Sequence, residues 1–123
     1  MSITGRVVVR RATLPVTFRL PGTGDLQIEC VVDTGFSGAI TLPLAAIMSM
    51  GLTFLKDRRI NLANDADVVV PVYIGNILWH GAKYSVKIIA SGRRPLIGVA
   101  LLYDNLLGID FVDTGIVTVQ QRA

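Results

Sequence analysis

Hydrophobic and polar residues alternate along several short stretches of the chain, and this alternation predicts β-strands. The clearest case is residues 14–20, Leu-Pro-Val-Thr-Phe-Arg-Leu, and the apolar run Val7-Val8-Val9 before them predicts a first strand. Residues 26–32 alternate first and then become wholly apolar, so we expect a strand that begins half exposed and ends buried. The sequence Pro-Gly-Thr-Gly-Asp at 21–25 lies between the two longer strands and predicts a hairpin.

The remaining apolar segments each predict a further short strand: residues 39–42, 52–62, 68–77, 82–90, 96–98, 106–111 and 116–119. Two brief helices are expected between them. The first covers residues 43–50, with Pro43 in its first turn and Gly51 as its stop signal, and the second covers residues 99–103. Strands this short and this frequent predict a mainly β, barrel-like domain.

Length and composition limit the organisation of the protein. The chain has 123 residues, the length of one compact domain, so residues 1–123 are treated as a single domain. Hydrophobic residues make up 51% of the chain and charged residues 17%. This balance argues against disorder and leaves more apolar surface than a small monomer readily hides, which indicates oligomerisation.

Charge and hydropathy argue against two classes of partner. Basic residues occur in scattered pairs such as Arg10-Arg11 and Arg93-Arg94, without interleaved aromatic residues, so no nucleic-acid partner is expected. Residues 34–55 are uncharged, but glycine, serine, threonine and proline interrupt them, so no membrane span is expected. The N-terminal segment lacks the continuous apolar block of a secretory signal, and we therefore expect a cytoplasmic protein.

Few residues are suited to metal or nucleophilic chemistry. The single cysteine, Cys30, lies in a strand that is expected to be buried, where a free thiol behaves as a small apolar group. The single histidine, His80, lies in the sequence Trp79-His80-Gly81, which is typical of a hairpin corner. A metal cluster or a Ser-His-Asp triad would have to be built around this one histidine, so we expect neither a metal nor another cofactor.

An acidic residue at the end of an apolar strand is the most unusual feature of the sequence. Asp33 follows Val31-Val32 and precedes Thr34-Gly35. A buried carboxylate is costly unless hydrogen-bond donors or a partner stabilise it. Thr34 offers a hydroxyl group, and Gly35 permits close approach of the backbone, so this turn is the first candidate for a functional site.

This segment, residues 31–38, resembles the active-site segment of the retroviral-type aspartic peptidases, especially their small bacterial members. The resemblance extends over residues 40–50, the loop 62–65 and the apolar run 96–102, and thus over nearly the whole chain. Asp-Thr-Gly alone is a weak signal, but two preceding apolar residues and a later apolar-apolar-Gly before a short helix make it stronger. The resemblance implies a retropepsin-like closed β-barrel, the single-lobe acid-protease fold, with one or two short helices.

The resemblance also implies an activity. In this family each subunit of a homodimer contributes one aspartate, so Asp33 would be the catalytic residue and would face Asp33 of a second copy. Two carboxylates so close share one proton. The ionised one would act as general base on a water that attacks a peptide bond of a polypeptide substrate, and the protonated one would donate to the oxyanion. No metal or other cofactor is implied.

Support roles follow from the same resemblance. Thr34 would bond across the interface, Gly35 would accommodate the substrate backbone, and Gly98 would pack behind the active-site loop. Pepsin-like enzymes have a serine where this chain has Phe36, and whether Ser37 reaches the aspartates is left open. The polar hairpin tip Ala63, Asn64, Asp65 and Ala66 would be a flap that closes over an extended peptide, the alternative being a plain exposed turn.

Three alternative interpretations have less support from the sequence. A second tripeptide, Asp113-Thr114-Gly115, lacks a following Ser-Gly turn and lies near the end of a chain long enough for one lobe, so we rejected an internal duplication. The main alternative to an aspartic endopeptidase is a catalytically silent domain of the same fold that serves dimerisation or peptide binding. A basic β-barrel that binds nucleic acid is a more distant alternative.

Overall fold

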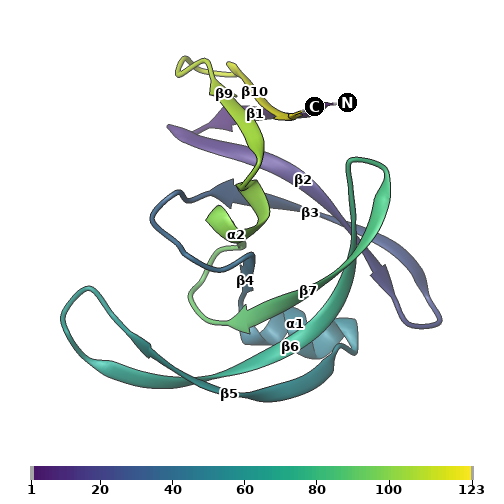
Figure 1. Ribbon diagram of the computed structural model, residues 1–123, viewed down its shortest axis with the longest axis vertical. Helices are drawn as coiled ribbons and strands as arrows, with labels where there is room; N and C mark the ends of the chain where they lie inside the picture. Colours follow the sequence, from purple (N-terminus) through teal and green to yellow (C-terminus); the bar gives the residue numbers. More distant parts are fainter. Residues whose placement is uncertain (1, 123) are drawn as a thin grey trace.

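The computed structural model describes residues 2–122, and these residues are mainly β-strand (Figure 1). They form the following strands: β1 (Ser2–Val8), β2 (Arg11–Leu20), β3 (Gly24–Val32), β4 (Ile40–Leu42), β5 (Thr53–Asn61), β6 (Asp67–Trp79), β7 (Ala82–Ala90), β8 (Leu96–Ile97), β9 (Asn105–Ile109) and β10 (Ile116–Gln121). Two short helices, α1 (Leu44–Met50) and α2 (Val99–Leu102), complete the described part of the chain. The prediction of a mainly β protein with brief helices is confirmed.

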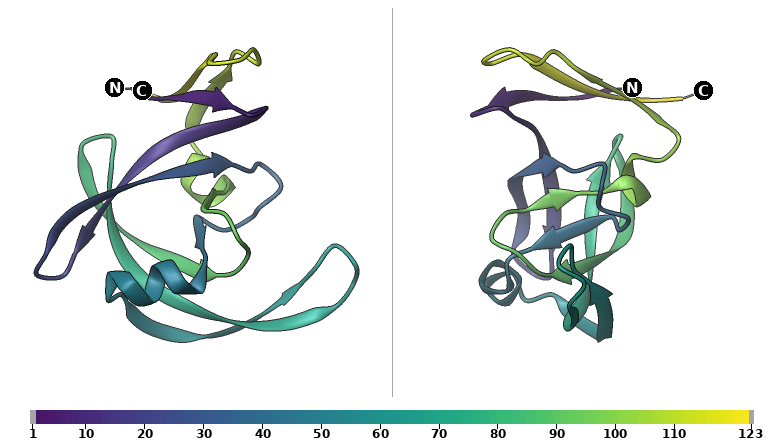
Figure 2. Two further views of the ribbon diagram at one scale, coloured as in Figure 1. Left: turned by 180° about the vertical axis from the view of Figure 1, so that it is seen from behind. Right: turned by 90° about the vertical axis from the view of Figure 1, so that its left-hand side faces the viewer.

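The strands form one ten-stranded sheet in the order β5-β6-β7-β4-β8-β3-β2-β1-β10-β9. Neighbours are antiparallel except for the pairs β3–β8 and β4–β7, which are parallel. An additional antiparallel pairing of β2 with β6 joins β6, β7, β4, β8, β3 and β2 into a closed ring. The long strands β2 and β6 curve strongly to make this closure, as Figures 1 and 2 show.

The hydrophobic core fills the inside of this ring. The alternation in β2 is the reason that one side of the strand faces inward: Leu14, Val16 and Phe18 are buried, whereas the residues between them are partly exposed. Each fully buried side chain of this size contributes about 1.5–3 kcal/mol to stability. Ile77 of β6 and Ile88 of β7 are buried in the same cluster, so the core holds the two halves of the ring together.

Turn residues define where the elements end. Gly51 ends α1 with a φ of 67°, as its position predicted, whereas Pro43 lies just before the helix and not in its first turn. The sequence placed Val9 in the first strand, and this was wrong. Val9 and Arg10 form the β1–β2 turn with φ values of 48° and 62°. β-Branched residues such as valine rarely adopt this conformation, and this turn contains no glycine or asparagine that would have indicated it.

The fold brings two distant segments to the same side of the molecule. The strands β1, β9 and β10 lie at one end and the β5–β6 hairpin at the other, while the loop after β3 and the tip of that hairpin project in the same direction (Figures 1 and 2). Within residues 2–122 neither helix is long and apolar enough to cross a lipid bilayer.

Candidate active site

Asp33 directly follows β3 and is half-buried. Its backbone N–H donates a hydrogen bond of 2.9 Å to the carbonyl oxygen of Ile97 in β8, which extends the parallel pairing of β3 with β8. Its carboxylate oxygen Oδ1 accepts a hydrogen bond of 2.9 Å from the backbone N–H of Gly35. The turn is closed by the N–H of Phe36, which donates to the carbonyl oxygen of Asp33 over 3.2 Å. The backbone of its own turn therefore orients the carboxylate.

Gly98 lies immediately behind this turn. A Cβ atom at this position would overlap the carbonyl oxygens of Phe36 and Gly38, so no larger residue fits without moving the loop. The N–H groups of Val99 and Ala100, at the start of α2, donate to these same two oxygens over 2.9 and 3.2 Å. The loop that carries Asp33 thus rests directly on the first turn of α2.

A cavity of about 430 Å³ opens above Asp33. The loop contributes Gly35, Phe36 and Ser37 to its wall, and β7 contributes Ile89. Several residues of the β5–β6 hairpin, among them Ile60 and Leu62, cover it. The wall is largely apolar but also contains polar residues, among them Ser37, Arg58 and Asn61.

Thr34 stands apart from the other predicted site residues. It is exposed and borders a neighbouring depression of about 520 Å³, which is also lined by Val99, Leu102, Tyr103 and Leu107. The sequence predicts that Thr34 bonds across an interface, and in the single chain Thr34 borders this second surface, which also includes Asp104, Asn105 and Arg122. Gly35 and Ser37 share the cavity of Asp33, and Gly98 supports its loop from behind.

The predicted flap residues divide into two groups. Ala63 borders the cavity of Asp33, whereas Asn64, Asp65 and Ala66 form the exposed tip of the hairpin and do not line that cavity. The tip is a closed turn: Leu62 N–H donates to the carbonyl oxygen of Ala66 over 2.9 Å, and Ala66 N–H donates to Oδ1 of Asn64 over 3.1 Å. In the single chain the base of the tip therefore lines the cavity of Asp33, and the end of the tip does not.

Sequence reasoning missed several residues of the cavity wall. Arg58 of β5 and Ile89 of β7 both line the cavity of Asp33. They come from strands that meet the Asp33 loop only through long-range pairing, and no local motif marks them. Strand alternation alone leaves open which face of β5 turns toward the cavity, so a side chain such as Arg58 could not be assigned to it.

The second Asp-Thr-Gly tripeptide lies in a turn between β9 and β10, where Asp113 and Thr114 are exposed. This turn is bonded to the first strand: the N–H of Val7 donates to the carbonyl oxygen of Gly115 over 2.8 Å, and the N–H of Thr114 donates to the carbonyl oxygen of Val7 over 3.1 Å. Asp113 does not line the cavity of Asp33, so its surroundings differ from those of Asp33.

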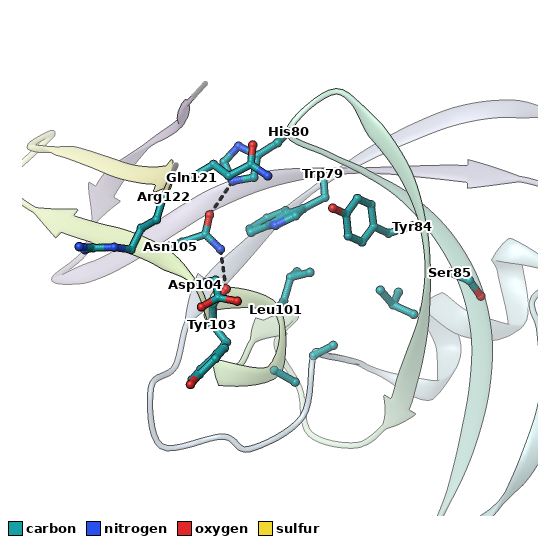
Figure 3. A pocket seen from close by; sticks show the side chains of 13 residues that line it. Trp79, His80, Tyr84, Ser85, Leu101, Tyr103, Asp104, Asn105, Gln121 and Arg122 are labelled. Carbon is teal, nitrogen blue, oxygen red and sulfur yellow. Dashed lines mark hydrogen bonds between the residues drawn. The ribbon is translucent and has the colours of Figure 1, made fainter.

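A larger cavity, about 800 Å³, lies between the β6–β7 turn, α2 and β9 and contains none of the predicted site residues (Figure 3). His80 lies at its edge, with Nε2 at 2.7 Å from Oδ1 of Asn105. Because the Asn105 amide N–H₂ donates to the carbonyl oxygen of Tyr103 over 2.9 Å, Oδ1 is the acceptor and we assign the proton to Nε2 of His80. His80 occupies the turn with a φ of 51° and ties it to β9, so it has a structural role.

Comparisons with known proteins bear on the fold. The chain matches no protein-family model and no curated protein sequence. Its structure is similar to that of a retropepsin-like aspartic protease from Rickettsia conorii, with a TM-score of 0.53 over 96% of this chain and 94% of that chain. The fold is retropepsin-like. At 18% sequence identity, the similarity concerns the fold alone. This fold agrees with the fold class predicted from the sequence.

Three segments that are far apart in the sequence lie around the cavity of Asp33 in this fold. The loop that carries Asp33, the β5–β6 hairpin that covers it and the Gly98 segment behind it lie together around one cavity. These three segments are far apart in the sequence, and each was predicted to belong to the site. The fold therefore brings the Asp33 loop, the β5–β6 hairpin and the Gly98 segment close together.

Proposed function

We propose that this protein is an aspartic endopeptidase that acts as a homodimer, with one Asp33 from each subunit. The observation that carries the proposal is the Asp33 carboxylate itself. It is oriented by the N–H of Gly35 at the wall of a largely apolar cavity that a hairpin covers, in a protein with a retropepsin-like fold. The apolar cavity and its hairpin cover suit an extended polypeptide as substrate.

The surface next to Asp33 supports a second copy as the missing half of the site. Thr34 is exposed directly beside Asp33, and the depression that it borders contains Val99, 37% exposed, and Tyr103, 78% exposed. Exposed apolar side chains grouped in this way are typical of an interface. A two-fold axis close to Thr34 would bring two copies of Asp33 together and would bury this depression.

The proposed reaction needs no group beyond the two aspartates and a water. The pair holds one proton, because two carboxylates so close do not both ionise readily. The ionised Asp33 takes a proton from the water, whose oxygen forms a bond to the carbonyl carbon of the substrate, while the protonated Asp33 donates to the carbonyl oxygen. The C–N bond then breaks: the leaving nitrogen takes up the proton of one Asp33, and the other Asp33 accepts a hydroxyl proton from the tetrahedral intermediate, so the pair again holds one proton.

Digestion of a reduced and alkylated protein such as serum albumin between about pH 4 and 7 tests this proposal. Wild type should cleave it, a pepstatin-type inhibitor should block the cleavage, and Asp33→Asn should abolish it while the protein remains dimeric in sedimentation. Asp113→Asn is the matched control, because it makes the same change in the other Asp-Thr-Gly tripeptide, and it should retain activity. A folded wild-type dimer without cleavage at any pH would favour a silent binding or dimerisation domain.

A further inference from the structure

The charged side chain of Arg58 lies on the inner face of the β5–β6 hairpin. Arg58 pairs with Val70, and Ile60 pairs with Val68, in the antiparallel register of β5 with β6. Directly paired residues of antiparallel strands project from the same face of the sheet. Val70 is only 9% exposed, and both Arg58 and Ile60 line the cavity of Asp33, so this face looks into the cavity.

The neighbouring Arg59 projects from the opposite face. It pairs with Val69, which is 61% exposed, and it does not line the cavity of Asp33. Arg58 and Arg59 are thus adjacent residues of the same type on the same strand, and both are exposed to solvent. They differ in the face from which they project, which makes Arg59 a matched control for Arg58.

Arg58 is the basic group within a cavity that has little negative charge of its own. The three segments that line the cavity, 33–41, 58–63 and 89–96, contain Asp33 as their single acidic residue. The ion pair found within residues 2–122 joins Arg19 to Asp25, so Arg58 has no carboxylate partner in the described part of the chain. Of the nearby acids, Asp67 accepts a hydrogen bond from the Asn61 side chain over 3.0 Å.

We propose that Arg58 determines the substrate specificity of this site by binding an acidic side chain of the substrate peptide. This inference rests on the proposed function and adds a substrate class to it. A guanidinium group binds a carboxylate through two parallel hydrogen bonds, and the apolar side chains of Ile60 and Ile89 beside it suit the methylene groups of a glutamate. Because the ionised Asp33 pair repels acidic side chains, an acidic side chain is favoured where a basic group such as Arg58 offsets this repulsion.

A set of fluorescein-labelled octapeptides with an apolar centre tests the proposal. Each peptide carries one Glu, or Gln or Lys in its place, moved along the outer positions. With the wild-type dimer, one position should prefer Glu over Gln by about tenfold in kcat/KM, as a charge-assisted hydrogen bond predicts. Arg58→Met should remove this preference, Arg58→Glu should replace it by a preference for Lys, and Arg59→Met should leave it unchanged. A preference that survives Arg58→Met, or that Arg59→Met removes equally, would overturn the proposal.

A binding measurement separates this inference from the proposed activity. The same peptides are titrated with the Asp33→Asn dimer, with and without Arg58→Met, and followed by fluorescence anisotropy. An Arg58-dependent preference for Glu in binding, without cleavage by wild type, would support the specificity and refute the peptidase function. Cleavage without such a preference would support the peptidase and overturn the role of Arg58. Peptides that are neither cleaved nor bound would overturn both.

Discussion

Replacing Gly98 by alanine tests whether the loop that carries Asp33 depends on its contact with the start of α2. The φ of Gly98 is −110°, which any residue adopts, so the change introduces no backbone strain of its own. The added Cβ would instead overlap the carbonyl oxygens of Phe36 and Gly38. These atoms belong to the backbone, and a change of side-chain rotamer cannot move them out of the way.

The expected cost has two parts. The two carbonyl oxygens accept hydrogen bonds from the N–H groups of Val99 and Ala100, and weakening both costs about 1–3 kcal/mol. Overpacking a tight contact costs about 1–3 kcal/mol more. We therefore expect Gly98→Ala to lower the free energy of unfolding by about 4 kcal/mol, which is a large share of the stability of a small domain.

Urea unfolding followed by the fluorescence of the single tryptophan, Trp79, measures this change. The protein concentration has to be equal for all variants, because a dimer gains apparent stability with concentration. Gly108→Ala in β9 is the matched control: its Cβ would meet only the hydroxyl group of Thr118, at 2.9 Å, and that side chain can rotate. A loss below about 1 kcal/mol for Gly98→Ala, or one equal to that of Gly108→Ala, would refute the reasoning.

Two further predictions concern Cys30 and Thr34. Burial, with a smaller effect from Glu29, raises the pKa of the Cys30 thiol from 9.0 to about 12. Since the unfolded chain loses this proton first, the stabilising effect is complete below pH 9 and is lost as the pH rises through 12. Between pH 7 and 10, the unfolding free energy of wild type should fall by about 1.4 kcal/mol more than that of Cys30→Val in urea titrations. Equal losses in the two proteins would contradict the burial of the thiol. Thr34→Val should raise the dissociation constant of the dimer about tenfold in sedimentation equilibrium. The control, Thr23→Val in the exposed β2–β3 turn, should leave this constant unchanged. An unchanged dissociation constant for Thr34→Val would exclude Thr34 from the interface.

Features encoded in neighbouring residues could be predicted from the sequence. The alternation in β2 predicts its buried side, because side chains alternate between the two faces of any strand. Gly51 predicts the end of α1, because the left-handed conformation there favours glycine. The Asp33 turn could be predicted because it is also local: the N–H that binds its carboxylate belongs to Gly35, two residues further along the chain.

Features that depend on long-range pairing could not be predicted. Arg58 and Ile89 reach the cavity of Asp33 through the curvature of the hairpin and the pairing of β6 with β7, and neither depends on a local motif. That the hairpin tip Ala63 to Ala66 closes over a bound peptide stays a prediction, because it depends on how the β5–β6 hairpin lies when a peptide is present. Val9 was misplaced because nothing in its neighbourhood marks the turn that it forms.

The central claim is that two copies of Asp33 form one active site, and subunit mixing tests it most directly. Wild type and Asp33→Asn are mixed in equal amounts, unfolded and refolded together so that subunits combine at random, and the cleavage of unfolded albumin is measured. If both aspartates are required, only dimers of two wild-type subunits are active, and about a quarter of the activity of the same total amount of wild type should remain. A remaining activity of about half would mean that each chain acts with its own Asp33 alone, which would contradict the account.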